Sequence, residues 1–91
     1  MAEEKILTKH SMGKIGKNIS KKKYDIIKDE IMQALRDKEL SHTELFIQLN
    51  KNLKNAFDGN ISWYGETVKL DLEARNQIER TTTKPRKYRL I

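Results

Sequence analysis

The chain has 91 residues, of which 36% are hydrophobic and 35% are charged, and its formal net charge is +6. This length predicts a single domain with a modest core. The absence of cysteine excludes a disulfide framework and thiol chemistry. Neither a signal-peptide h-region nor an apolar run of membrane-spanning length is visible. We therefore expect a soluble cytoplasmic protein.

The positive charge lies at the two ends of the chain. Residues 1–23 contain seven lysines and two glutamates, and residues 79–91 contain five cations and one glutamate. The residues between these ends are slightly acidic. Such segregation favours polyanionic partners, nucleic acid above all, with an anionic membrane surface as the weaker option. We expect DNA as the partner and no membrane.

Residues 1–20 are predicted to form a basic, partly flexible N-terminal arm, and residues 21–91 a folded domain. Gly13 and Gly16 weakly match a phosphate-cradling loop, but a plain flexible turn is the favoured interpretation. The arm also contains scattered apolar residues, at Ile6, Leu7, Ile15 and Ile19. These side chains would stay exposed to water on a fully solvated arm, so we expect the arm to dock on the domain.

Apolar residues at spacings of three and four predict a first helix over residues 21–38, with Ser20 as its N-cap. This start would place Lys21, Lys22 and Lys23 in the first turn, where the helix dipole disfavours cations. The mismatch indicates either a requirement for phosphate contact or a helix that begins nearer Asp25. We favour the later start, with the lysines simply solvated.

The next two helices have clear boundary signals. Ser41 and Glu44 match a capping box, which predicts a second helix that runs from there to a left-handed stop at Gly59. A third amphipathic helix is predicted over residues 62–75. Asn76 follows it and tolerates the left-handed conformation that ends many helices. A tight link between the second and third helices is typical of a helix-turn-helix.

The C-terminal segment predicts a hairpin. Residues 78–82 and 87–91 are rich in β-branched, aromatic and apolar side chains, and the turn between them contains Pro85. Pairing Ile78 with Leu90 would place Glu79 opposite Arg89. An opposite-charge pair would then hold the register.

These features resemble a known family. The run from Leu72 to Arg80 is similar to the end of the recognition helix and the first wing strand of bacterial winged helix-turn-helix regulators, in which a glycine commonly replaces Asn76. Residues 40–45, 62–64 and 67–75 resemble a small group of uncharacterised bacterial winged-helix proteins. The resemblance covers residues 24–91. It implies a mainly α fold with a three-helix core and a C-terminal two-stranded wing, in a DNA-binding transcriptional regulator.

In the winged-helix mechanism, the third helix enters the major groove and the wing contacts phosphate or the minor groove. The residues expected to contact nucleic acid lie on the third helix, the wing and the first helical turn: Ser62, Thr67, Lys69, Lys84, Arg86, Lys87, Lys21, Lys22 and Lys23. On the third helix, however, Glu66 and Glu73 argue against base-specific readout. We therefore expect phosphate contacts to dominate, against the alternative that the wing cations only confer solubility.

Trp63 and Leu70 lie two turns apart on a flank of the third helix, away from its core line. The favoured interpretation is that this flank packs beneath the wing or the N-terminal arm, because large aromatic side chains are usually buried. The alternative hypothesis is a protein interface, most simply a homodimer contact anchored by Trp63.

Catalytic motifs are missing from the sequence. His10 and His42 are the two histidines, so neither a metal cluster nor a catalytic triad can be assembled around them. No nucleotide-binding fingerprint is present. We expect no enzyme activity, no cofactor, no metal and no small-molecule ligand.

Overall fold

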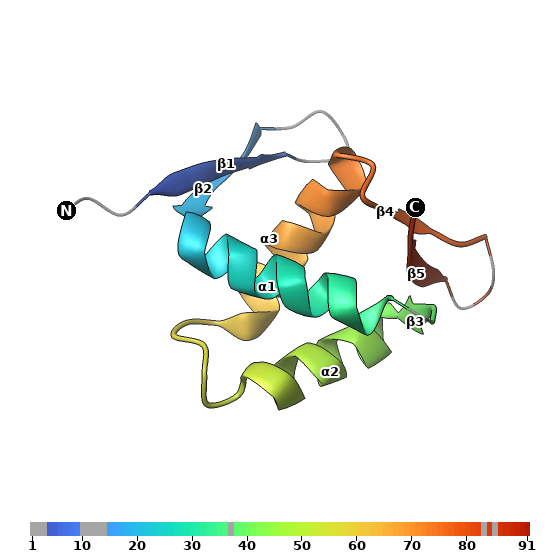
Figure 1. Ribbon diagram of the computed structural model, residues 1–91. Helices are drawn as coiled ribbons and strands as arrows, with labels where there is room; N and C mark the ends of the chain where they lie inside the picture. Colours follow the sequence, from blue (N-terminus) through green and yellow to red (C-terminus); the bar gives the residue numbers. More distant parts are fainter. Residues whose placement is uncertain (1–3, 10–14, 37, 83, 85) are drawn as a thin grey trace.

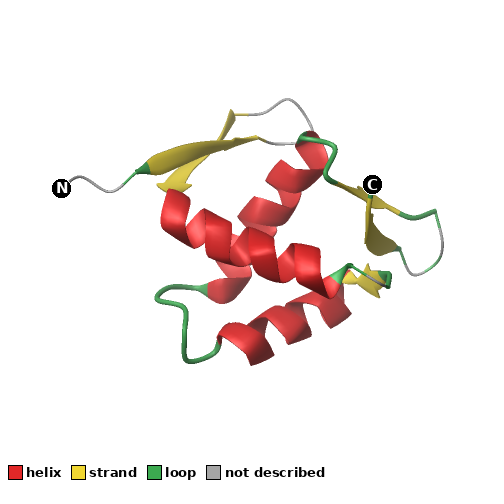
Figure 2. Cartoon of the chain, in the orientation of Figure 1, coloured by secondary structure: helices red, strands yellow, loops and turns green. Residues whose placement is uncertain are grey.

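The computed structural model describes residues 4–9, 15–36, 38–82, 84 and 86–91. Its elements are β1 (Lys5–Lys9), β2 (Ile15–Ser20), α1 (Lys21–Ala34), β3 (Leu40–Ser41), α2 (His42–Leu53), α3 (Ile61–Ala74), β4 (Ile78–Arg80) and β5 (Lys87–Leu90). The described part is an α/β fold with three helices, an N-terminal hairpin and a C-terminal three-stranded antiparallel sheet. Figures 1 and 2 show the hairpin and the sheet at opposite ends of the helical layer.

The core lies where the three helices meet. Each helix places apolar residues on its inner side at spacings of three and four, so their burial forms one cluster. Its fully buried helical members are Ile27, Ile31, Leu45, Leu49, Val68 and Leu72. Each such side chain contributes about 1.5–3 kcal/mol on burial. On α1, Ile27 and Ile31 follow the apolar spacing that predicted the first helix.

The first helix begins where its N-cap predicts. The Lys23 amide donates to Ser20 Oγ at 3.3 Å, and α1 starts at Lys21. The favoured later start, nearer Asp25, is therefore wrong, and the three lysines do lie in the first turn. The helix ends at Ala34, before the predicted end at residue 38, because the chain turns at the buried Leu35 to reach β3.

The capping box of α2 is confirmed. Glu44 N donates to Ser41 Oγ at 3.2 Å, and Ser41 N donates to the Glu44 carboxylate at 3.0 Å. The predicted end near Gly59 is wrong, since α2 ends at Leu53. The amides of Ala56 and Phe57 both donate to the Leu53 carbonyl and close a turn there. Gly59, with φ of 138°, lies in the loop that leads to α3.

The predicted end of α3 and the predicted register of the C-terminal hairpin are confirmed. Asn76 adopts a φ of 61° directly after the helix. Ile78 pairs with Leu90, and Glu79 pairs with Arg89. A third strand, which the sequence patterns did not predict, extends this hairpin into a sheet. It is β3, which pairs antiparallel with β5. Pro85, expected in the turn, lies outside the described residues.

The N-terminal segment forms a hairpin where a partly flexible arm was expected. β1 pairs antiparallel with β2, with Ile6 opposite Ile19. Ile19 is buried and Ile6 packs against the core, so the expected docking is confirmed for both side chains, while Leu7 is exposed. A Cβ on Gly16 would lie 1.8 Å from the Thr8 carbonyl oxygen, so this close approach requires glycine. Gly13 and the side chain of Ile15 lie outside the described part.

Candidate nucleic-acid interface

The arginines of the described chain are largely engaged by carboxylates. Arg80 Nε donates to Glu73 at 2.9 Å, and Arg89 Nε donates to Glu79 at 3.1 Å. Arg89 also bonds Glu39 at 3.3 Å. These carboxylates raise the pKa of both arginines above their ordinary value. These two cations therefore hold the fold together and are poorly placed to bind an external anion.

A buried carboxylate joins the N-terminal hairpin to the helices. Asp71 on α3 is fully buried and accepts hydrogen bonds from Lys9 N at 2.7 Å, from Arg75 Nε at 2.9 Å and from the Tyr24 hydroxyl. Burial and the bond to Asp71 raise the pKa of Tyr24 above its ordinary range. The charge of Asp71 is thus satisfied by β1, α1 and its own helix, which is a structural role.

Lys69, which was predicted to contact nucleic acid, does not lie on an exposed face of α3. The residue is 2% exposed. Its Nζ donates to the Tyr88 hydroxyl at 3.0 Å, lies 4.4 Å from the centre of the Tyr88 ring and is 3.5 Å from Glu66 Oε1. β5 places Tyr88 over this side of the helix, which the sequence of α3 alone could not indicate.

The other predicted residues of α3 are more accessible. Ser62 is exposed, Thr67 is half-buried, and Leu70 is half-buried. Trp63 is 41% exposed. The expectation that Trp63 packs beneath the wing or the arm holds only in part, because it contacts the N-terminal hairpin and still remains substantially accessible.

The wing carries free cations. Lys84 and Arg86 are exposed, and neither has an ion-pair partner within the described chain. Lys87 is half-buried, and its backbone amide donates to Thr81 Oγ1 at 3.0 Å. Lys84 and Arg86 therefore present positive charge that has no ion-pair partner among the described residues. By contrast, hydrogen bonds from Ser41 lower the pKa of the Glu44 carboxyl, and the Lys87 ammonium helps to lower it further.

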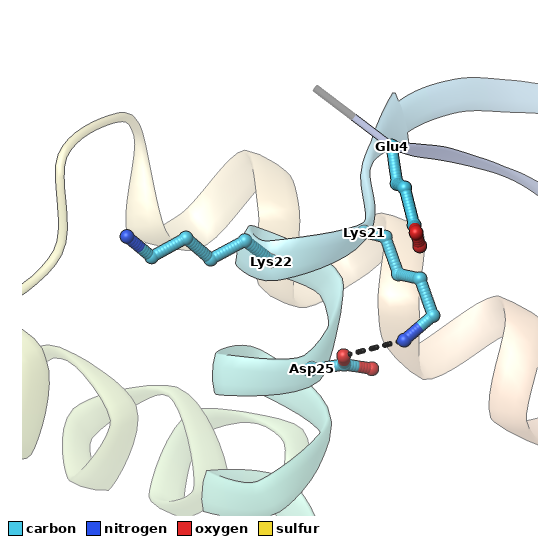
Figure 3. Close-up of a pocket in the computed structure, with 4 residues that line it drawn as sticks. All are labelled: Glu4, Lys21, Lys22 and Asp25. Atoms are coloured by element: carbon cyan, nitrogen blue, oxygen red, sulfur yellow. Dashed lines mark hydrogen bonds and ion pairs between the residues drawn. The ribbon is translucent and has the colours of Figure 1, made fainter. Parts of the chain in front are cut away.

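The first turn of α1 carries further cations. Lys21 Nζ donates to Asp25 at 2.9 Å, and this bond raises the pKa of Lys21. Figure 3 shows both residues on one side of a pocket that also includes Glu4, while Lys22 extends away from them. The pocket combines two carboxylates with two ammonium groups, so it is poorly suited to an anion. Lys22 and Lys23 have no ion-pair partner in the described chain.

Neither a metal site nor a membrane-spanning helix is found among the described residues. Among them, no group of three or more histidine, aspartate or glutamate side chains is placed to hold a metal ion. Within the same residues, no helix combines the length and apolarity needed to cross a membrane.

The fold and its charges define a small basic α/β domain with three helices, in which the N-terminal hairpin is an integral part. Residues 5–88 match DUF6958, a family of unknown function, and the chain belongs to this family. The matched region includes the N-terminal hairpin and all three described helices. No curated protein and no solved structure matches the chain significantly.

Proposed function

We propose that this protein binds double-stranded DNA in the manner of a winged helix-turn-helix transcriptional regulator, mainly through phosphate contacts. The observation that carries the proposal is the division of its cations. Strand arginines are engaged by carboxylates, whereas Lys84, Arg86, Lys22 and Lys23 have no carboxylate partner among the residues that the structure describes. Unpaired cations can release counterions from a phosphate backbone without first breaking an internal ion pair.

The arrangement of the elements supports a winged-helix mode. Three helices are followed by the β4–β5 hairpin, whose tip would be the wing. In Figure 1 the strands β4 and β5 and the start of α1 lie on opposite sides of the molecule. A duplex that lies along α3 could therefore meet unpaired cations on both sides of one groove.

The side of α3 that carries Glu66 and Glu73 favours weak sequence preference. Glu66 is accessible there, whereas the side chain of Glu73 is 8% exposed. Glu66 lies 3.5 Å from Lys69 and 3.8 Å from His42 Nδ1, and Glu73 bonds Arg80. These contacts reduce the repulsion between the two carboxylates and phosphate. They also leave α3 without a free arginine or lysine for bidentate recognition of guanine, so we assign positioning to phosphate contacts.

The test replaces Lys84, Arg86 and Lys87 together with alanine. Anisotropy of a labelled random-sequence duplex should show weaker binding, and the slope of log affinity against log salt should become less negative by about 0.9 for each lost phosphate contact. Alanine at Lys51 and Lys54, which are exposed near the end of α2, removes two cations elsewhere and should have a much smaller effect.

A second control probes the buried lysine. Lys69→Met keeps the length of the side chain and removes its charge, and it should leave duplex affinity and salt slope unchanged because Nζ is bonded internally. If the wing variant also binds with unchanged affinity and slope, the wing has no role in binding DNA.

A further inference from the structure

Three aromatic rings form a row at the start of α3. The centres of the Phe57 and Tyr64 rings are 5.3 Å apart, and those of Trp63 and Tyr64 are 4.9 Å apart, both edge to face. Asn60 caps the helix by accepting a hydrogen bond from the Trp63 amide at 3.0 Å, which fixes the backbone beneath the row. Trp63 remains 41% exposed, an unusual position for the largest apolar side chain.

Lysines from two other segments lie on this row. Lys17 Nζ, from β2, is 5.9 Å from the centre of the Trp63 ring, and Lys23 Nζ, from α1, is 5.4 Å from the centre of the Tyr64 ring. Lys22 and Lys23 also line a pocket beside Phe57. We call these six residues the aromatic corner: Lys17, Lys22, Lys23, Phe57, Trp63 and Tyr64.

The charges of the aromatic corner are unbalanced. None of its three lysines has an ion-pair partner in the part of the chain that the structure describes. Asp58 is the carboxylate that lines the same pocket. Lys22 and Lys23 thus share a pocket with one carboxylate, and Lys17 lies over the exposed indole of Trp63. This combination suits a ligand that is both aromatic and anionic.

We propose that the aromatic corner binds unpaired nucleotides of a single-stranded nucleic acid, with a base stacked on Trp63 and the adjoining phosphates held by Lys17, Lys22 and Lys23. A duplex keeps its bases stacked inside the helix, so only an unpaired base can lie on the indole. An apolar protein partner would leave the three ammonium groups uncompensated, whereas a nucleotide strand satisfies the rings and the cations together.

This site is separate from the wing. The aromatic corner is built around the first turns of α1 and α3, and the strands β4 and β5, which lead to the wing tip, lie on the other side of the molecule in Figure 1. The two proposals share Lys22 and Lys23, but the aromatic corner adds Lys17 and the exposed ring of Trp63, so the inference goes beyond the proposed duplex binding. Alanine at Lys84, Arg86 and Lys87 should weaken duplex binding and leave the single-strand signal of Trp63 intact, so failure of either proposal can be recognised.

The chain contains a single tryptophan, so its intrinsic fluorescence reports directly on the aromatic corner. The full chain is titrated with an oligo-dT strand and, at equal ionic strength, with an abasic sugar-phosphate strand of the same length. We expect oligo-dT to quench Trp63 and to bind about ten-fold more tightly than the abasic strand. Equal quenching and equal affinity for the two strands would overturn the proposal, as would no binding of either.

Variants separate stacking from charge. Trp63→Leu keeps an apolar side chain, and anisotropy of labelled strands should show about ten-fold weaker binding of oligo-dT with little change for the abasic strand. The matched control is Ile47→Ala, because Ile47 is 62% exposed on α2, and it should bind both strands normally.

A second variant keeps the test decisive if Trp63→Leu fails to fold. Alanine at Lys17 and Lys23 should weaken binding of both strands and flatten its salt dependence. Normal binding of oligo-dT by this folded variant would contradict the proposal. A second contradicting result would be a dimer, detected by sedimentation, that the Trp63→Leu substitution dissociates but oligo-dT does not. In that case a second copy of the chain would cover the aromatic corner.

Discussion

The two hairpins of this domain are held by different kinds of contact. In the C-terminal hairpin, Glu79 and Arg89 lie opposite each other on the surface, so the register is supported by residues of the hairpin itself. The N-terminal hairpin instead depends on a buried carboxylate of α3 and on the close approach of Gly16 to β1. A hairpin whose strand pairing is set by its own residues can be predicted from its own sequence. A hairpin whose pairing depends on residues elsewhere in the chain cannot.

The comparison also separates cations that form ion pairs within the fold from cations that remain available to bind an external anion. Arg75 binds the buried Asp71, and Arg80 binds Glu73. Lys84 and Arg86, beyond the strands of the C-terminal hairpin, are exposed without such partners in the described chain. Positive net charge therefore overstates the number of cations available to a partner, and the unpaired subset is the better guide to a candidate binding surface.

The largest effect is expected at the buried carboxylate. Asp71→Asn removes the charge that pairs with Arg75 and cannot satisfy all the donors that surround it, so the free energy of unfolding should fall by about 2–4 kcal/mol. Urea denaturation followed by circular dichroism measures this loss, and faster hydrogen exchange at the Lys9 amide should accompany it. The exposed Asp58→Asn should change stability by no more than about 0.5 kcal/mol. Equal stability of the two variants would mean that Asp71 does not anchor the hairpin.

A smaller loss is expected for Gly16→Ala. The added methyl group would meet the backbone of Thr8, so β1 and β2 must separate, at a cost of about 1–3 kcal/mol. The same denaturation measurement applies, and chemical shifts of the hairpin amides would locate the change. Asn18→Ala, at an exposed position of the same strand, is the control. A Gly16→Ala variant as stable as this control would contradict the close strand approach.

The smallest effect is expected in the C-terminal hairpin. Glu79→Gln removes one partner of Arg89, but both side chains are about half exposed and Arg89 retains Glu39. Solvent-exposed pairs of this kind contribute little. The midpoint of thermal unfolding should therefore stay close to that of the unmodified chain, at low and at high salt. A shift as large as that of Gly16→Ala would show that the two hairpins do not differ in the way described.

The features predicted correctly depend on residues a few positions apart. Ser41 and Glu44 cap a helix within four residues, Asn76 ends α3 directly, and the C-terminal hairpin has its charge pair across one turn. The helix ends predicted wrongly lie where tertiary contacts intervene. The chain leaves α1 at the buried Leu35, and after α2 it closes a turn that brings Phe57 onto Tyr64.

The candidate sites also divide into features set by nearby residues, which the sequence predicts, and features set by distant residues, which it does not. The exposure of Lys84 and Arg86 follows from their place beside a turn, and the sequence predicts it. The burial of Lys69 depends on Tyr88, which lies 19 residues away, and the role of Asp71 depends on Tyr24, 47 residues away. The aromatic corner combines three segments of the chain, and its one signal in the sequence was the position of Trp63 off the core line of α3.

The most direct test of DNA binding is the salt dependence of duplex affinity for the unmodified chain. Fluorescence anisotropy of a labelled random-sequence duplex, titrated at several salt concentrations, measures it. If Lys84, Arg86, Lys87, Lys22 and Lys23 each contact a phosphate, as we propose, the slope of log affinity against log salt should be about −4 to −5. No binding at low salt, or binding with a flat slope, would contradict a phosphate-contacting DNA-binding domain.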